Sequence, residues 1–386
     1  MNFNKIKLAA FIFICLNTIN VFSQLDNKLL SNELTINTKD TNKLLFSFNS
    51  LNFLRNTEYF GDVEFGKTFF GYSLNPKLVY IPNSFVRIDL GGLFRKDFGN
   101  TEFKIVAPTF SVKISKNGYS GIFGNYEGGM THQFIEPLFN IDFAISKPLE
   151  NGLQLKIDKR RIWSDTWIDW QKMIYQDSPF KEEISAGTTN YITILGEDEK
   201  LKISIPLQAI VHHFGGQIDT THTTPLSTEI NTASGLRISY FFPEGSFLKE
   251  LRSDNYYVTY YEESPKKRQL FTKGDGMYFN FTIRSKILSI MASYWNGHQY
   301  VAPNGTPIFQ SINPIEPTRL TYKEPNRSLL FVRLFYEKQL YKGLNLDIRF
   351  EPFYEFNRKA IDFSYSIYLK YNLNVKLATL KPNFAD

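Results

Sequence analysis

Long runs in which apolar and polar residues alternate are the most informative feature of the chain. Between residues 361 and 377 the odd positions are apolar and the even positions are mostly polar, and residues 344–356 repeat the pattern. Alternation with a period of two is typical of a β-strand with one apolar face. A soluble β-sandwich would show it too, but its strands are usually about 5–6 residues long. The length of these runs favours tilted strands that cross a membrane.

The same pattern recurs along the whole chain, and about sixteen segments carry it. We place them at residues 44–56, 62–73, 84–95, 102–115, 118–126, 133–147, 152–171, 185–195, 200–214, 231–243, 253–262, 276–284, 286–296, 328–340, 343–356 and 360–372. An antiparallel membrane barrel closes with an even number of strands. The sequence therefore predicts an all-β transmembrane antiparallel β-barrel of about sixteen strands, with fourteen as the alternative.

The lengths of the connections give an independent check, because bacterial barrels have short periplasmic turns and longer external loops. With the N-terminus in the periplasm, every second connection is external. The external set contains 57–61, 96–101, 127–132, 172–184, 215–230, 263–275 and 297–327. The periplasmic set contains 116–118, 148–151, 196–199, 285 and 341–342. Two connections fit less well, since 244–252 is long and 357–359 is short. We expect an outer-membrane barrel with both termini in the periplasm.

The N-terminus has the order of a secretory signal peptide. Lys5 and Lys7 precede an apolar run that is too short to cross a membrane as a helix, which needs about 20 residues. We predict a signal peptide over 1–23, a periplasmic segment or plug over 24–43, the barrel over 44–377 and a C-terminal tail over 378–386. The single cysteine, Cys15, lies in the signal peptide, so disulfides and cysteine ligands are excluded from the mature chain.

Composition agrees with one membrane barrel domain. Aromatic residues make up 16% of the chain, with 36 Phe and 22 Tyr, while no long apolar run follows the signal peptide. This combination excludes a helical membrane protein and suits strands with one face in lipid and the other in water. Trp170, Tyr294 and Trp295 fall close to predicted external strand ends, where an aromatic girdle at the membrane interface is expected.

Charged residues on the polar faces of the predicted strands are the candidates for function. We expect them to line an aqueous pore and to select solutes by charge. They are Arg87, Asp89, Arg95, Lys202, Arg237, Arg284, Asp347, Arg349, Glu351, Glu355, Asp362 and Lys370. A plugged interior in which these charges neutralise one another is the alternative. Residues 25–43 are a candidate plug.

Catalysis, metal binding and cofactors have weaker support. The histidines His132, His212, His213, His222 and His298 lie on or beside predicted external loops, but no H-x-x-x-H spacing holds a metal. No serine, histidine and acidic residue align on adjacent strands in a way that the sequence alone supports. Nucleotide-binding glycine motifs are absent. The net charge of +6 is too scattered to indicate nucleic acid. We expect neither an enzyme nor a cofactor.

One stretch of the chain resembles a known group of proteins. The motifs are His132–Phe139, Glu150–Gln154, Asp165–Trp170 and Lys181–Glu183. They resemble uncharacterised, porin-like outer-membrane proteins of Bacteroidota, a Gram-negative phylum, over about a quarter of the chain. The resemblance implies a barrel and a lineage but no activity.

Three functional hypotheses follow from the sequence. The first is a porin-like channel for small hydrophilic solutes. The second is a non-conducting structural or accessory subunit of an outer-membrane export, assembly or uptake complex, with other proteins docking on the external loops 215–230 and 297–327. The third is a barrel enzyme that modifies lipid or glycan. Outer-membrane lipid is the partner common to all three.

Overall fold

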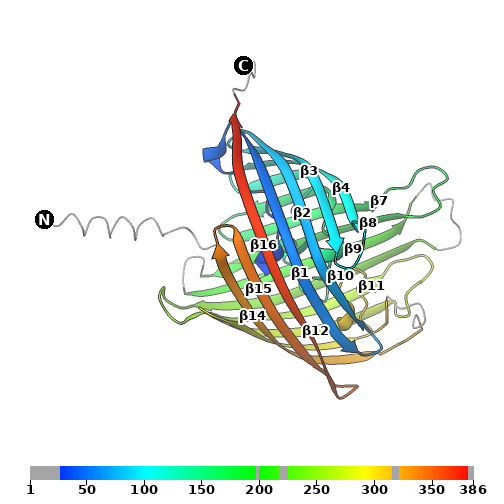
Figure 1. Ribbon diagram of the computed structural model, residues 1–386. Coiled ribbons are helices and arrows are strands. Elements are labelled where there is room, and N and C mark those ends of the chain that lie inside the picture. Colours follow the sequence, from blue (N-terminus) through cyan, green and yellow to red (C-terminus); the bar gives the residue numbers. More distant parts are fainter. Residues whose placement is uncertain (1–26, 197–199, 217–224, 315–320, 381–386) are drawn as a thin grey trace.

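The structure is a closed, antiparallel barrel of sixteen strands, which confirms the predicted fold class. The computed structural model describes residues 27–196, 200–216, 225–314 and 321–380, so the predicted signal peptide lies outside the described residues. Figure 1 shows β1 and β16 side by side, where the barrel closes. Among the described residues, no helix is long and apolar enough to span a membrane.

The strands follow one another around the barrel in chain order. They are β1 (Lys43–Phe60), β2 (Phe65–Asn83), β3 (Val86–Asp97), β4 (Ile105–Lys116), β5 (Tyr119–Asn125), β6 (Asn151–Asp158), β7 (Ile162–Lys172), β8 (Glu182–Leu195), β9 (Leu201–Gly215), β10 (Ser227–Phe241), β11 (Leu248–Glu262), β12 (Lys273–Ser285), β13 (Ser289–His298), β14 (Asn326–Tyr341), β15 (Leu344–Glu355) and β16 (Ala360–Thr379). Short helices are η1 (Asn27–Leu30), η2 (Thr38–Asp40), η3 (Gly129–His132), α2 (Phe143–Ser146) and η4 (Pro307–Phe309).

The two ends of the barrel differ. Lys43 on β1 pairs with Thr379 on β16, so both ends of the chain leave from one end of the barrel, which we call the terminus end. Its connections are short, such as the Asn117-Gly118 turn, in which both residues have positive φ angles of 52° and 75°. This is the conformation that suits a two-residue hairpin. The opposite end, which we call the loop end, carries the long connections 126–150 and 299–325.

The alternation places apolar side chains on the outer face and charged ones inside. Val106, Phe123 and Phe279 point outward and are exposed, whereas their neighbours along each strand face the interior. Trp295 is an exception to the predicted interface girdle, because it is completely buried inside the barrel. The girdle prediction was wrong for Trp295. It considered how far the residue lies from the strand end, but not whether its side chain faces the lipid or the interior.

Two predicted segments differ from the structure, although the total of sixteen is right. Residues 133–147 form no strand and instead belong to the connection 126–150, which folds into the barrel. Residues 152–171 form two strands, β6 and β7, with a tight turn between Lys159 and Ile162. The two errors cancel in the count. They also place the connection 148–151, predicted to be a turn at the terminus end, at the loop end.

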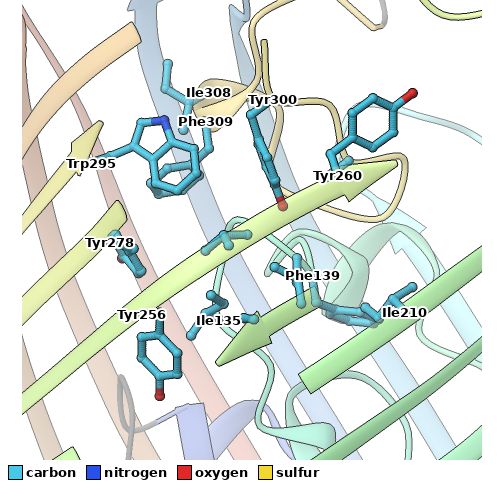
Figure 2. Packing of buried hydrophobic residues seen from close by; sticks show 14 of the residues in the cluster. Ile135, Phe139, Ile210, Tyr256, Tyr260, Tyr278, Trp295, Tyr300, Ile308 and Phe309 are labelled. Atoms are coloured by element: carbon cyan, nitrogen blue, oxygen red, sulfur yellow. The ribbon is translucent and has the colours of Figure 1, made fainter. Parts of the chain in front are cut away.

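The interior at the loop end is filled by the 126–150 segment and by the described residues 299–314 of the 299–325 connection, which we call the two inward-folded connections. The 126–150 segment contributes Ile135, Leu138 and Phe139 to the largest buried cluster, and the 299–325 connection contributes Tyr300 and Phe309. Figure 2 shows Ile135, Phe139, Tyr300 and Phe309 near three side chains of the wall, which are Trp295, Tyr278 and Tyr256. The ring centroid of Trp295 lies 5.1 Å from that of Tyr300 and 5.5 Å from that of Phe309.

The two inward-folded connections are also hydrogen-bonded to each other. The Tyr300 hydroxyl donates to the Pro137 carbonyl at 3.0 Å, and the Thr306 amide donates to the Glu136 carbonyl at 2.9 Å. The Asn140 amide donates to the Asn304 carbonyl at 2.8 Å. Because backbone groups of both segments pair inside the barrel, the two connections form one packed unit.

Residues 27–42 lie against this unit from the terminus end. The Leu34 amide donates to Glu127 Oε1 at 2.8 Å, and the Asn32 amide donates to Thr131 Oγ1 at 3.3 Å. Lys370 and Arg349 of the wall hold the same segment through Asn32 and Asn27.

Candidate functional site

The twelve charged residues predicted to line a pore all belong to barrel strands, and most are packed. Asp89, Arg95, Arg237, Asp347, Arg349, Glu351, Glu355, Asp362 and Lys370 are buried, whereas Arg87, Lys202 and Arg284 are partly exposed. Several form ion pairs inside the barrel, such as Arg349 with Asp347 and Arg87 with Asp89. Their assignment to a pore stays a prediction.

A serine and a histidine face each other across two neighbouring strands at the loop end. Ser185 on β8 is the direct register partner of His212 on β9. The Ser185 hydroxyl lies 3.1 Å from His212 Nδ1. On the other side of the imidazole ring, His212 Nε2 lies 4.0 Å from Glu183 Oε1. Glu183 and Ser185 point to the same side of β8 because they are two residues apart. Serine, histidine and acid therefore follow one line along the inner wall.

The hydrogen bonds of Ser185 define the direction of its own proton. Asn304 Nδ2 donates to Ser185 Oγ at 3.1 Å, and Gln171 Nε2 donates to the same atom at 3.3 Å. A hydroxyl oxygen accepts two hydrogen bonds and donates one. With both acceptor positions occupied, the hydroxyl proton is directed at His212 Nδ1. His212 then carries its own proton on Nε2, toward Glu183.

This arrangement has the parts of a nucleophile and a general base. A serine hydroxyl becomes nucleophilic when a neighbouring histidine accepts its proton, and an acidic group orients that histidine. The amides of Asn304 and Gln171 supply donors beside the nucleophile, where a negative oxygen would develop during acyl transfer. The 4.0 Å separation of His212 Nε2 and Glu183 Oε1 is an ion-pair distance and is longer than a hydrogen bond.

A cavity of about 310 Å³ adjoins the serine. Its polar side comprises Lys147, Glu150, Asn151, Asp169, Gln171, Glu183, Ser185 and Asn304. The apolar side comes from the wall and from the 126–150 segment, and comprises Ile105, Phe139, Phe143, Pro148, Leu149 and Trp167. The cavity therefore combines an apolar side with several charged and amide groups, and convergent polar groups beside apolar surface are common in small-molecule sites.

His132, the first of the predicted loop histidines, has a different role. It is completely buried in the 126–150 segment, with Nδ1 at 2.9 Å from Asp165 Oδ2 and Nε2 at 2.8 Å from Glu150 Oε2. Its ring stacks on Trp167 at 4.7 Å. Burial lowers the pKa of His132, but the two carboxylates outweigh burial and raise it to about 9. The imidazolium thus binds the segment to the wall, and its ring nitrogens face no open space.

The other histidines do not gather at one point. His212 and His213 lie on β9 and His298 ends β13, while His222 lies outside the described residues. Within the described ranges there is no group of three or more histidine, cysteine or acidic residues placed to hold a metal ion.

The sequence contained a signal for the serine site that sequence reasoning missed. Residues 185–195 and 200–214 were correctly predicted as neighbouring strands, with their turn at 196–199. Counting back evenly from that turn puts Ser185 opposite Ile210, two residues away from His212 on the same inner face of β9. The observed register differs from this count by two residues, with a shift between Thr193 and Leu195, and brings Ser185 opposite His212. No signal indicated Asn304, because it reaches Ser185 from a connection whose path has no periodicity.

Solved structures with a similar fold are outer-membrane barrels. OprD from Pseudomonas aeruginosa has a TM-score of 0.51 at 10% identity, over 87% of this chain and 95% of that chain. A loop-deletion mutant of OmpT from Vibrio cholerae has a TM-score of 0.51 at 12% identity, over 86% of this chain and 100% of that chain. At these identities the likeness concerns the fold alone, which is that of outer-membrane β-barrels.

A comparison with protein-family models identifies the family of the chain. The model described as Lipid A 3'-O-deacylase-type matches residues 36–380, which is nearly the whole barrel. No curated protein matches the chain. The expectation that the chain is not an enzyme is corrected by this match, because the family is described by a hydrolytic activity. The expectation rested on the sequence alone, in which the serine, histidine and amide groups that meet in the folded barrel lie far apart.

Proposed function

Because the chain belongs to the Lipid A 3'-O-deacylase-type family, we propose that it is an outer-membrane hydrolase that cleaves an ester-linked acyl chain from a lipid. Ser185 is the nucleophile and His212 is the general base. The observation that carries the proposal is the convergence of His212, Asn304 and Gln171 on the Ser185 hydroxyl beside a cavity with one apolar side.

The proposed reaction is an acyl transfer in two steps. His212 Nδ1 accepts the hydroxyl proton while Ser185 Oγ attacks the ester carbonyl carbon. The tetrahedral intermediate then loses the alcohol, which takes that proton from His212 as it leaves. Water attacks the acyl-enzyme in the second step, gives its proton to His212 and releases the fatty acid. Ser185 recovers its proton from His212.

Two groups of side chains support the chemistry. Asn304 and Gln171 donate to the negatively charged oxygen of each tetrahedral intermediate, where fixed donors are worth most. Glu183 stabilises the imidazolium form of His212 that exists during each step. The site lies at the loop end of the barrel. With the termini in the periplasm, as the loop lengths predict, this end faces the outer leaflet.

The test is release of fatty acid by the purified barrel in detergent, from 4-nitrophenyl esters and from lipid A. We expect hydrolysis by the wild type and a loss of kcat on the order of 10³-fold or more in Ser185→Ala and in His212→Ala. Ser204→Ala is the matched control. Ser204 is another buried, inward-facing serine, and its hydroxyl is bonded to Thr193 at 3.3 Å. A wild-type barrel that cleaves no ester would contradict the proposal.

A solute channel is the second candidate, favoured by one observation. A cavity of about 560 Å³ lies toward the terminus end, lined by residues such as Asn75, Asn372, Lys77, Arg87 and Lys370. Such a polar lining suits a small hydrophilic solute. Phe143, Lys147, Pro148 and Leu149 line both this cavity and the one beside Ser185, and so stand between them. Conductance in planar bilayers tests the channel, and a non-conducting wild-type barrel would contradict it.

A further inference from the structure

The barrel wall is lower at one place on the loop end. β5 has seven residues and β6 has eight, whereas β4 has twelve and β7 has eleven. Pairing of β4 with β5 begins only at Ser111, so residues 105–110 of β4 extend beyond the end of β5. Six residues of a strand span about 20 Å. On the other side, pairing of β6 with β7 ends at Asp169, and β7 continues to Lys172.

The result is a notch in the wall between β4 and β7, with Asn125 and Asn151 at its floor. These two residues are the last register pair of β5 and β6, and their side-chain amides are hydrogen-bonded to each other. Beyond them the chain leaves the wall and enters the barrel as the 126–150 segment.

The cavity beside Ser185 reaches this notch. Ile105 from the extended part of β4 and Asn151 from the notch floor line the same cavity as Ser185. Phe143 and Leu149 of the 126–150 segment supply its apolar lining behind the notch. The outer face next to the notch is apolar and exposed, with Val106 at 65% and Trp170 at 38% of their full exposure. Ile105, Phe143 and Leu149 therefore form an apolar side of the cavity between the notch and the nucleophile, opposite polar residues such as Lys147 and Asp169.

We infer that the notch between β4 and β7 is a lateral entrance through which the acyl chain of a membrane lipid reaches Ser185 from within the bilayer. This inference rests on the proposed function and adds the route of the substrate, a lipid ester whose acyl chain lies along the apolar side of the cavity. The headgroup remains at the loop end, above the floor formed by Asn125 and Asn151. Short water-soluble esters have no long acyl chain that must pass through the notch, so their hydrolysis should not depend on it.

The first test compares esters of different chain length. Leu149→Trp narrows the cavity behind the notch, and Leu155→Trp adds the same bulk on the outward face of β6, where Leu155 is 53% exposed. We expect Leu149→Trp to reduce kcat/KM for 4-nitrophenyl palmitate at least ten times more than for 4-nitrophenyl butyrate. The control Leu155→Trp should reduce both equally or not at all. Equal losses on both esters in Leu149→Trp would overturn the entrance.

The second test detects the acyl chain without catalysis. Four tryptophans are present in the chain, and Trp167 lines the cavity while Trp295 is buried elsewhere in the barrel. Variants that keep one tryptophan each, with the others changed to phenylalanine, are placed in vesicles of lipids with brominated acyl chains. We expect quenching of Trp167 and none of Trp295, with the outward Trp170 as the positive control.

Equal, negligible quenching of Trp167 and Trp295 would overturn the entrance even in an active enzyme. Quenching of Trp167 in a barrel that cleaves no ester would keep the entrance and reject the proposed hydrolase. The two proposals therefore fail separately.

Discussion

The side-chain amide of Asn304 lies 3.1 Å from the hydroxyl of Ser185, although 119 positions separate the two residues in the chain. Ser185 belongs to the barrel wall and Asn304 to the 299–325 connection, so the candidate site is complete only when that connection is packed inside the barrel. The packing of this connection inside the barrel therefore also completes the candidate site.

Removal of the Asn304 amide should slow the chemical step. We expect Asn304→Ala to lower kcat for ester hydrolysis by about 10²-fold with little change in KM, because the lost donor acts on the negative oxygen of the intermediate. Asn313→Ala on the same connection is the control, since Asn313 donates to the Asp62 carbonyl, away from Ser185. Steady-state kinetics with a soluble ester measure both. Equal kcat values for the two variants would show that Asn304 only fills space.

Gly305 tests whether the two inward-folded connections must touch. A Cβ at Gly305 would lie 2.1 Å from the Pro137 carbonyl oxygen, so Gly305→Ala has to push the 299–325 connection away from the 126–150 segment. We expect loss of ester hydrolysis together with faster proteolysis within residues 126–150. Gly121→Ala is the control, because the nearest atom to a Cβ there is Leu155 Cδ2 at 3.8 Å. Unchanged proteolysis in Gly305→Ala would contradict the coupling.

The wall of the barrel could be predicted from the sequence, because apolar and polar residues alternate with a period of two along its strands. Phe279 and Phe281 face outward while Asn280 between them is buried, and this alternation needs no knowledge of distant residues. The strand count was right because two local errors, one strand too many at 133–147 and one too few at 152–171, cancelled. Only a segment such as 133–147, whose apolar residues face other apolar residues inside the barrel, imitates the pattern without being part of the wall.

Only the part of the candidate site that lies on the barrel strands could be approached from the sequence. The alternation places Ser185 and His212 on the inner faces of neighbouring strands, but their direct pairing depends on the observed register, which the position of the hairpin turn alone does not give. Asn304 and the lining residues Phe139 and Leu149 come from connections that fold back into the barrel. Their positions depend on long-range contacts, such as the bond from Tyr300 to Pro137, and these leave no periodicity in the sequence.

The protonation of His132 should make stability depend on pH. Its pKa in the folded barrel is about 9, above the usual 6.5, so the stabilisation is complete below pH 6.5 and is lost as the pH rises through about 9. The shift corresponds to about 3 kcal/mol. We expect the urea unfolding midpoint of the wild type to fall between pH 7 and pH 10 by more than that of His132→Gln. The same pH dependence in both proteins would contradict the assignment.

Asp142 should be one of the residues that hold the 126–150 segment in place. Its carboxylate lies 2.5 Å from Arg55 Nε and 2.9 Å from Lys67 Nζ, and its side chain is 4% exposed. Burial raises the pKa of Asp142, but Arg55 and Lys67 together hold it below the usual value. Asp142→Asn leaves the buried Arg55 with weaker compensation, from Glu351 at 3.3 Å.

Loss of one partner from a buried ion pair costs about 3–5 kcal/mol, so Asp142→Asn should lower the free energy of unfolding by an amount in that range. Asp40→Asn is the matched control. Asp40 pairs with Lys43 at 2.9 Å, where both side chains are more than 20% exposed, and such pairs contribute about 0–1 kcal/mol. Urea titrations of the barrel in detergent measure both variants. If the two variants unfold at the same midpoint, the pair of Arg55 and Asp142 does not anchor the segment. The aromatic packing around Phe139 would then be what keeps it inside the barrel.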